Sequence, residues 1–119
     1  MVQIKIGDVA VGDGAPCYIV GEIGINHNGD LGTARRLIDV AAIVGANAVK
    51  FQKRTIDVVY TADELAKPRE NPFGATNGDL KRGLEFGHDQ YQHIDKYCKE
   101  KNVAWFASAW DEASVDFME

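Results

Sequence analysis

Four polar side chains interrupt or end apolar runs of the kind that form buried β-strands. Glu22 lies within YIVGEIGI, and Lys50 and Gln52 lie within AVKFQ, two positions apart and so on one face of a strand. Ser108 ends a third run, VAWFAS. Because a charge inside an apolar strand is costly unless it is paired, these residues are candidates for a site. An ammonium beside an amide and a hydroxyl is suited to bind the phosphate or carboxylate group of a small molecule.

Each of these residues also has a structural interpretation. Glu22 and Lys50, on neighbouring strands, could form an ion pair that does no chemistry. Ser108 could be a helix-entry residue. Lys53 and Arg54, which follow the second strand, are interpreted as a solvated pair of charges with no further role.

Asn26 and His27 form a polar pair at the turn after the first strand. A hydrogen-bonded structural histidine is the commoner case at such a position, and a wall of the site is the functional alternative. A metal ligand is disfavoured because metal sites need several ligands. The other two histidines, His88 and His93, lie on or beside a later helix at a spacing that does not share one face.

The elements that would position these residues alternate between strands and helices. Period-two and helical spacings of apolar residues, with Gly, Pro, Asn and Asp at the breaks, predict their limits. The expected elements are, in order, a hairpin of Val2–Ile6 and Val9–Val11, a strand at Tyr18–Ile25, a helix from Leu31 that is capped by Asp30 and ends at Gly45, a strand at Ala48–Gln52, a loop over Lys53–Gly87, a helix capped by Asp89, a strand at Val103–Ser108, and a helix capped by Asp111.

This order predicts an α/β fold with a parallel sheet, whose βαβ units are right-handed and whose strands are covered on both faces. Ligands of such folds bind beyond the carboxyl ends of the strands, where the four candidates gather. The long loop is expected to be functional or mobile. The aromatic residues Trp105, Phe106 and Trp110 are expected in the core. Three βα units cannot close an eight-stranded barrel, which needs about 250 residues.

Composition narrows the classes of protein. With 119 residues, 45% of them hydrophobic, the chain suits one folded domain and not a disordered segment. A net charge of −5 disfavours a nucleic-acid or anionic-membrane surface. No apolar run is long enough for a membrane span, and the start lacks a signal peptide, so we expect a cytoplasmic protein. Cys17 and Cys98 are then expected to be reduced thiols.

Two motifs together are familiar. VGEIGINHNGD, followed by an Ala/Leu-rich helix and GANAVKFQ, resembles the opening of the sialic acid synthase family, which includes N-acetylneuraminate, legionaminate, pseudaminate and spore-coat polysaccharide synthases. LEFGHDQYQHIDKYCKEKNV and WFASAWDEASVDF resemble later parts of the same barrel. The resemblance covers nearly the whole chain.

The resemblance implies the first three βα units of a TIM barrel, so that 1–119 is the N-terminal portion and 1–16 a β-hairpin lead-in. The rest of the barrel and an antifreeze-like domain would lie outside this chain. It also implies an enzyme that condenses phosphoenolpyruvate with an N-acetylated amino sugar such as N-acetylmannosamine and releases phosphate. A divalent metal, Mn²⁺ or Mg²⁺, would polarise the sugar aldehyde in the full-length enzyme, which would be a homodimer.

Carried onto this sequence, the resemblance places Glu22 beside the reacting centre as the catalytic carboxylate. Lys50 and Gln52 would hold phosphoenolpyruvate, with help from Ser108. An asparagine of the long loop would meet the amino sugar, and Asn77 and Asn71 are the candidates. The family's metal ligands have no counterparts here, so no metal ligand is assigned in this chain.

Two other functions stay open. A different phosphosugar TIM-barrel enzyme, such as an aldolase, would use Lys50 as a Schiff-base nucleophile. A non-catalytic half-barrel would need a partner chain to cover its open edge.

Overall fold

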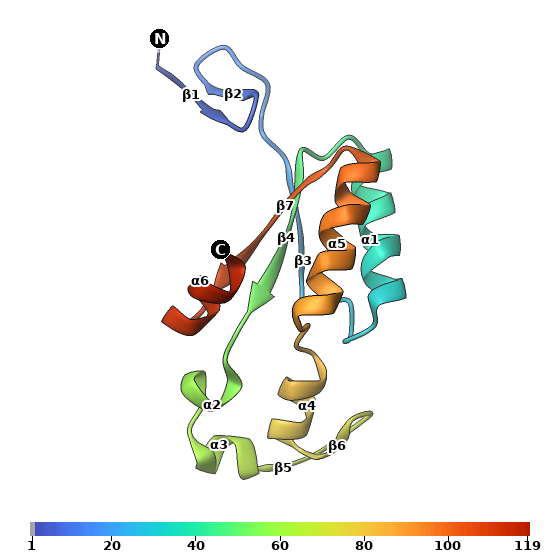
Figure 1. Cartoon of the computed structure of the whole chain (residues 1–119), viewed down its shortest axis with the longest axis vertical. Coiled ribbons are helices and arrows are strands. Elements are labelled where there is room, and N and C mark those ends of the chain that lie inside the picture. Colours follow the sequence, from blue (N-terminus) through green and yellow to red (C-terminus); the bar gives the residue numbers. More distant parts are fainter. Residues whose placement is uncertain (1) are drawn as a thin grey trace.

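A three-stranded parallel sheet with the order β3-β4-β7 forms the centre of the molecule, and two helices, α1 and α5, lie side by side on one of its faces (Figure 1). The structure is a computed structural model that describes residues 2–119. Its elements are β1 (Gln3–Ile6), β2 (Val9–Gly12), β3 (Val20–Gly24), α1 (Leu31–Ile43), β4 (Ala48–Lys53), α2 (Ile56–Val59), α3 (Ala62–Ala66), β5 (Pro68–Asn71), β6 (Gly74–Thr76), α4 (Asn77–Gly83), α5 (His88–Lys101), β7 (Ala104–Ala109) and α6 (Glu112–Met118).

The core lies between the sheet and the helix pair α1 and α5. Val49 and Phe51 of β4 are fully buried there, as are Ile38 of α1 and Ile94 of α5. Lys50 lies between Val49 and Phe51 along β4, and its side chain therefore lies on the other face of the sheet. The predicted α/β fold with a parallel sheet is therefore confirmed.

The opposite face of the sheet is open in the described chain, so the expected cover on both faces is not present within residues 2–119. Glu22, Lys50 and Phe106 occupy one register across this face. Phe106 is 45% exposed and Trp110 48% exposed, so their predicted place in the core is wrong. Trp105, on the covered face, does pack against the core. Apolar residue type predicts a strand but does not say which face has a neighbour.

The segment between β4 and α5 is not the loop that its sequence predicts. It contains α2, α3, the hairpin of β5 and β6, and α4. These elements are too short for a periodic pattern to emerge. Local bonds begin two of them: the side chain of Thr61 accepts from Glu64 N–H, and Thr76 and Asp79 form a reciprocal capping box. Figure 1 shows the segment beyond the carboxyl end of β4.

Helix ends follow local chemistry. Asp30 and Asp111 cap α1 and α6 as predicted, accepting from Thr33 N–H and Ser114 N–H. Gly45, with φ of 80°, follows the end of α1 as expected. The predicted cap at Asp89 is wrong, because α5 begins at His88.

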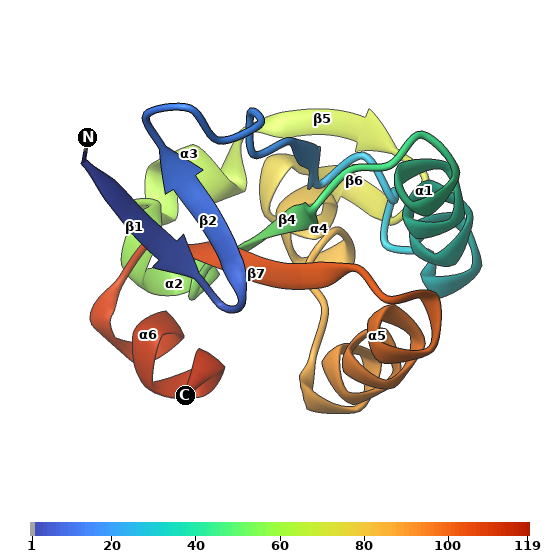
Figure 2. The same ribbon diagram turned by 90° about the horizontal axis from the view of Figure 1, so that it is seen from above.

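The hairpin of β1 and β2 pairs as predicted, and Figure 2 shows it lying apart from the helix pair. Within residues 2–119, none of the helices combines the length and apolar character that a bilayer crossing requires.

Candidate active site

Glu22, Lys50 and Gln52 converge on the open face of the sheet, near the carboxyl ends of β3 and β4. Glu22 pairs with Lys50 in the strand register, and their side chains meet with Lys50 Nζ 2.8 Å from Glu22 Oε2. Gly24, where the register shifts, has φ of 56°. A Cβ at Gly24 would lie 3.2 Å from Glu22 Oε1 and 3.4 Å from Gln52 Nε2, so a side chain there would crowd both groups. Ser108 is the register partner of Gln52 on β7.

The ion pair between Glu22 and Lys50 is accessible. The side chain of Glu22 is 52% exposed and that of Lys50 is 28% exposed. A pair this open to solvent contributes only about 0–1 kcal/mol to stability. The ion pair therefore does little to hold the sheet together. Its exposed groups remain accessible to a small anion.

The backbone under this site is held from the covered face. Tyr91 of α5 donates its hydroxyl to the carbonyl oxygen of Gln52 at 3.0 Å. Burial raises the pKa of this hydroxyl, so it remains a donor. The Tyr91 ring stacks on Trp105 and meets Phe51 edge-on. Aromatic packing on one face thereby fixes the strand that carries Lys50 and Gln52 on the other.

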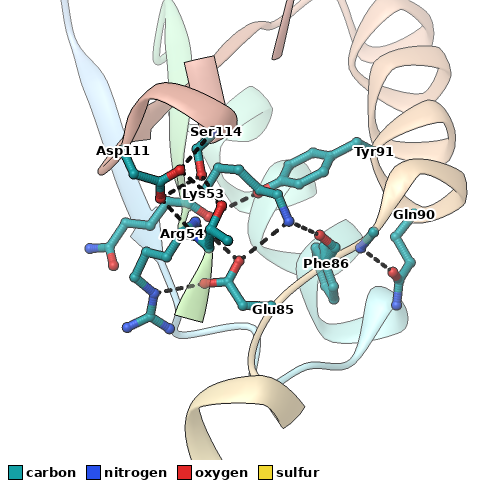
Figure 3. Close-up of polar contacts among 11 residues, drawn as sticks. Lys53, Arg54, Glu85, Phe86, Gln90, Tyr91, Asp111 and Ser114 are labelled. Carbon is teal, nitrogen blue, oxygen red and sulfur yellow. Dashed lines mark hydrogen bonds and ion pairs between the residues drawn. The ribbon is translucent and has the colours of Figure 1, made fainter. Parts of the chain in front are cut away.

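A buried charged cluster lies just beyond Gln52, and sequence reasoning missed it (Figure 3). Arg54 Nε donates to Glu85 Oε1 at 2.7 Å, and Lys53 Nζ donates to the carbonyl oxygen of Phe86 at 2.9 Å. The Arg54 side chain is only 3% exposed, so the interpretation of Lys53 and Arg54 as a solvated pair is wrong. The available signal was the position of Glu85 between two apolar residues in LEF.

Asp111 joins the ends of β4 and β7. Its carboxylate accepts from the backbone N–H and the hydroxyl of Thr55 at 2.7 and 2.8 Å, and from the backbone N–H and hydroxyl of Ser114 at 2.8 and 2.9 Å. Burial raises the pKa of Asp111, but these hydrogen bonds outweigh it and lower the pKa to about 2. The carboxylate is ionised at neutral pH and holds two strand ends together.

His27 lies in the core and not beside Glu22. Its ring stacks on Phe86 with the centroids 3.9 Å apart, and its Nδ1 accepts from Gly29 N–H at 3.0 Å. Burial lowers the pKa of His27 to about 4, against a smaller opposing effect of Asp30. The neutral ring therefore fixes the turn after β3, as a structural histidine does. Any part that it has in walling the site would act through this turn.

Asn26, Asn71 and Asn77 have local partners. Asn26 Nδ2 donates to the carbonyl oxygen of Ile23. Asn71 Nδ2 donates to the carbonyl oxygens of Arg69 and Thr76, across the hairpin of β5 and β6. Buried Asn77 donates from Nδ2 to the carbonyl oxygen of Glu64 at 3.2 Å and accepts from Arg69 at its Oδ1. These contacts shape the segment between β4 and α5, and contact of Asn71 or Asn77 with an amino sugar stays a prediction.

A divalent metal finds no ready set of ligands here. Across residues 2–119, no three His, Cys, Asp or Glu side chains are grouped so that they could hold an ion. The polar groups that this part of the chain brings to the open face are Glu22, Lys50, Gln52 and Ser108.

Comparison with known proteins shows which proteins the chain resembles. N-acetylneuraminate-9-phosphate synthase of Homo sapiens is 41% identical over 110 residues, which cover 91% of this chain and 31% of that protein. N,N'-diacetyllegionaminic acid synthase of Legionella pneumophila is 32% identical and is covered to the same 31%. The chain thus spans about a third of the length of the curated relatives it matches.

The fold agrees with a solved structure. The crystal structure of N-acetylneuraminic acid (sialic acid) synthetase from Leptospira borgpetersenii superimposes with a TM-score of 0.79 at 27% identity, over 98% of this chain and 37% of that one. The sequence pattern of the NeuB family matches residues 37–119. With most of its length matched in this way, the chain belongs to the NeuB family.

Proposed function

We propose that residues 1–119 form the first part of a TIM-barrel synthase that condenses phosphoenolpyruvate with an N-acylated amino sugar and releases phosphate. The observation that carries this proposal is the meeting of Glu22, Lys50 and Gln52 on the open face of the sheet, beside Ser108. Synthases of sialic and legionaminic acids among the relatives support the class of reaction. The open face would then be the interior of the closed barrel.

The reaction makes one carbon–carbon bond. C3 of phosphoenolpyruvate attacks the aldehyde carbon of the open-chain sugar, and the aldehyde oxygen takes a proton and becomes a hydroxyl. Water adds at C2, and the bond between C2 and the phosphate oxygen breaks, so that C2 becomes a ketone and inorganic phosphate leaves. Positive charge develops at C2, and negative charge has to be held on the phosphate and carboxylate groups.

The residues suit these needs. Lys50 supplies a cation, and Gln52 and Ser108 supply neutral donors on the same face, for the phosphate or carboxylate of phosphoenolpyruvate. Glu22, in contact with Lys50, is the carboxylate next to this anion and stabilises positive charge at C2. Residues 2–119 provide no ligand set for Mn²⁺ or Mg²⁺, so we give the metal no step in this chain.

The aldolase alternative gives Lys50 a different role. The Nζ atom that lies 2.8 Å from Glu22 Oε2 would then form a Schiff base with the substrate carbonyl. Borohydride trapping of substrate on Lys50 would support the aldolase, and failure to trap would count against it.

Phosphate release by the complete polypeptide tests the proposal. We expect release only when phosphoenolpyruvate, an N-acyl amino sugar and Mn²⁺ are all present. Glu22→Gln and Lys50→Ala should each lower kcat/KM by well over about tenfold, because each removes a group that acts on the transition state. Lys96→Ala, at an exposed lysine of α5, is the control and should be unaffected. Full activity in both site variants would refute the site.

A further inference from the structure

Glu85 is the single carboxylate shared by two cations at the carboxyl end of β4. Besides its contact with Arg54 Nε, it accepts from the Arg54 backbone N–H at 3.3 Å and lies 3.7 Å from Lys53 Nζ. Figure 3 shows Glu85 between the two cationic side chains. The Lys53 and Glu85 side chains are 13% and 11% exposed, so this group of charges is largely withdrawn from water.

Glu85 supplies the only negative charge that the described residues place in contact with Lys53 and Arg54. Lys53 and Arg54 carry two positive charges against one negative charge, and Arg54 Nη2 is already buried without a partner among residues 2–119. Removing one partner of a buried pair leaves an uncompensated charge, which costs far more than the loss of an exposed pair. Loss of the Glu85 carboxylate would therefore leave Lys53 and Arg54 without the negative charge that both contact.

The same cluster ties both ends of the segment between β4 and α5. Arg54 stands at its beginning and donates from Nη1 to the hydroxyl of Tyr60 at 3.0 Å. Glu85 and Phe86 stand at its end, and Phe86 stacks on His27 of the turn after β3. Both ends of the segment are therefore held by one buried cluster beside the site.

We propose that Glu85 is a positioning residue for the acceptor side of the reaction, an inference that rests on the proposed function. Through its contacts with Lys53 and Arg54, it fixes where residues 55–84 lie relative to Lys50 and Gln52. In the proposed function phosphoenolpyruvate binds side chains on the sheet, whose strands pair with one another through β3, β4 and β7 and include no residue of the 55–84 segment. Asn71 and Asn77, which are predicted to contact the amino sugar, both lie in the segment that Glu85 anchors, so binding of this substrate should depend on Glu85.

Two measurements on the complete polypeptide test this proposal. The variant is Glu85→Gln, and the matched control is Asp57→Asn, which breaks the pair of Arg82 and Asp57 within the same segment, where the side chains are 51% and 75% exposed. Amide hydrogen exchange across residues 55–84 should quicken by about tenfold or more in Glu85→Gln, as expected for the loss of charged hydrogen bonds. It should stay unchanged in Asp57→Asn.

Kinetics separate positioning from simple loss of folded protein. In Glu85→Gln the KM for the amino sugar should rise by about tenfold while the KM for phosphoenolpyruvate changes by less than about twofold. Equal rises in both KM values, or a fall in kcat alone, would overturn the proposal, as would unchanged exchange. If Glu85→Gln does not fold, Tyr60→Phe removes one contact of Arg54 and should give a smaller shift in the same direction.

Failure of the proposed function would be visible separately. Wild-type protein that never condenses phosphoenolpyruvate with an N-acyl amino sugar would refute that function. The exchange measurement would then decide by itself whether Glu85 anchors residues 55–84.

Discussion

The two faces of the β3-β4-β7 sheet differ in almost every respect, although their residues alternate along the same strands. On the covered face, Val49 and Phe51 are fully buried against α1 and α5. On the other face, Lys50 and Glu22 form an ion pair that solvent reaches. Neighbours in sequence such as Lys50 and Phe51 therefore serve different purposes. The covered face contributes buried apolar area to the stability of the fold, whereas the open face carries an exposed ion pair that contributes little to it.

This contrast also separates two kinds of charged contact. The cluster around Glu85 and the bonds of Asp111 are withdrawn from the open face and hold strand ends and connecting segments together. The pair of Glu22 and Lys50 connects adjacent strands that already pair through their backbones. A charged pair that adds little to stability is the better candidate for chemistry.

The largest expected effect separates adjacent residues of β4. Phe51→Ala should lower the free energy of unfolding by about 3–5 kcal/mol, because it leaves a cavity in the core. Lys50→Ala should lower it by less than about 1 kcal/mol, because its ion pair is exposed. Chemical denaturation of the complete protein measures both. Similar losses in the two variants would remove the distinction between the faces.

A second prediction concerns pH and the covered face. The pKa of His27 falls from 6.5 to about 4 on folding, so the unfolded state binds the proton first as the pH falls. The free energy of unfolding should therefore have its full value above about pH 6.5. It should fall as the pH is lowered from 6.5 to 4, by up to about 3 kcal/mol, since each pKa unit corresponds to about 1.4 kcal/mol.

Denaturation curves at a series of pH values check this prediction. His27→Asn keeps an acceptor for Gly29 N–H but cannot titrate, so it should flatten the slope between pH 6.5 and 4. His93→Asn, at an exposed position, should leave the slope unchanged. A wild-type slope in His27→Asn would show that this histidine is not responsible.

The smallest expected effects compare two serines. Ser108→Ala, on the open face, should raise the KM for phosphoenolpyruvate several-fold with little change in stability, the effect of about one neutral hydrogen bond. Ser114→Ala removes a fully buried hydroxyl bonded to Asp111 and should lower the free energy of unfolding by about 1 kcal/mol without changing that KM. Steady-state kinetics and denaturation of the same two samples would show whether the roles are reversed.

The sequence predicts well what is decided locally. The strand with Lys50 and Gln52, the helix after Asp30 and the helix after Asp111 all form as expected, because alternation and caps act within a few residues. The meeting of Glu22 and Lys50 could also be anticipated, since adjacent parallel strands bring their carboxyl ends together.

Prediction from the sequence fails where the structure depends on contacts between distant segments. Glu85 and Arg54 are 31 residues apart, and nothing local marks them as partners. The short elements between β4 and α5 begin at local caps and are too short to produce a periodic pattern. Aromatic type predicts Phe106 and Trp110 in the core, yet Phe106 lies on the open face of the sheet and Trp110 lies beyond the end of β7, and both are exposed.

The central claim is that the open face binds phosphoenolpyruvate through Lys50. Calorimetric titration of the complete protein with phosphoenolpyruvate tests it most directly, with wild type compared with Lys50→Ala and with Lys96→Ala at an exposed position on α5. The account predicts that Lys50→Ala weakens binding by about tenfold or more, the value of one charge-assisted contact, and that Lys96→Ala binds as wild type does. Equal affinity in Lys50→Ala and wild type would contradict it.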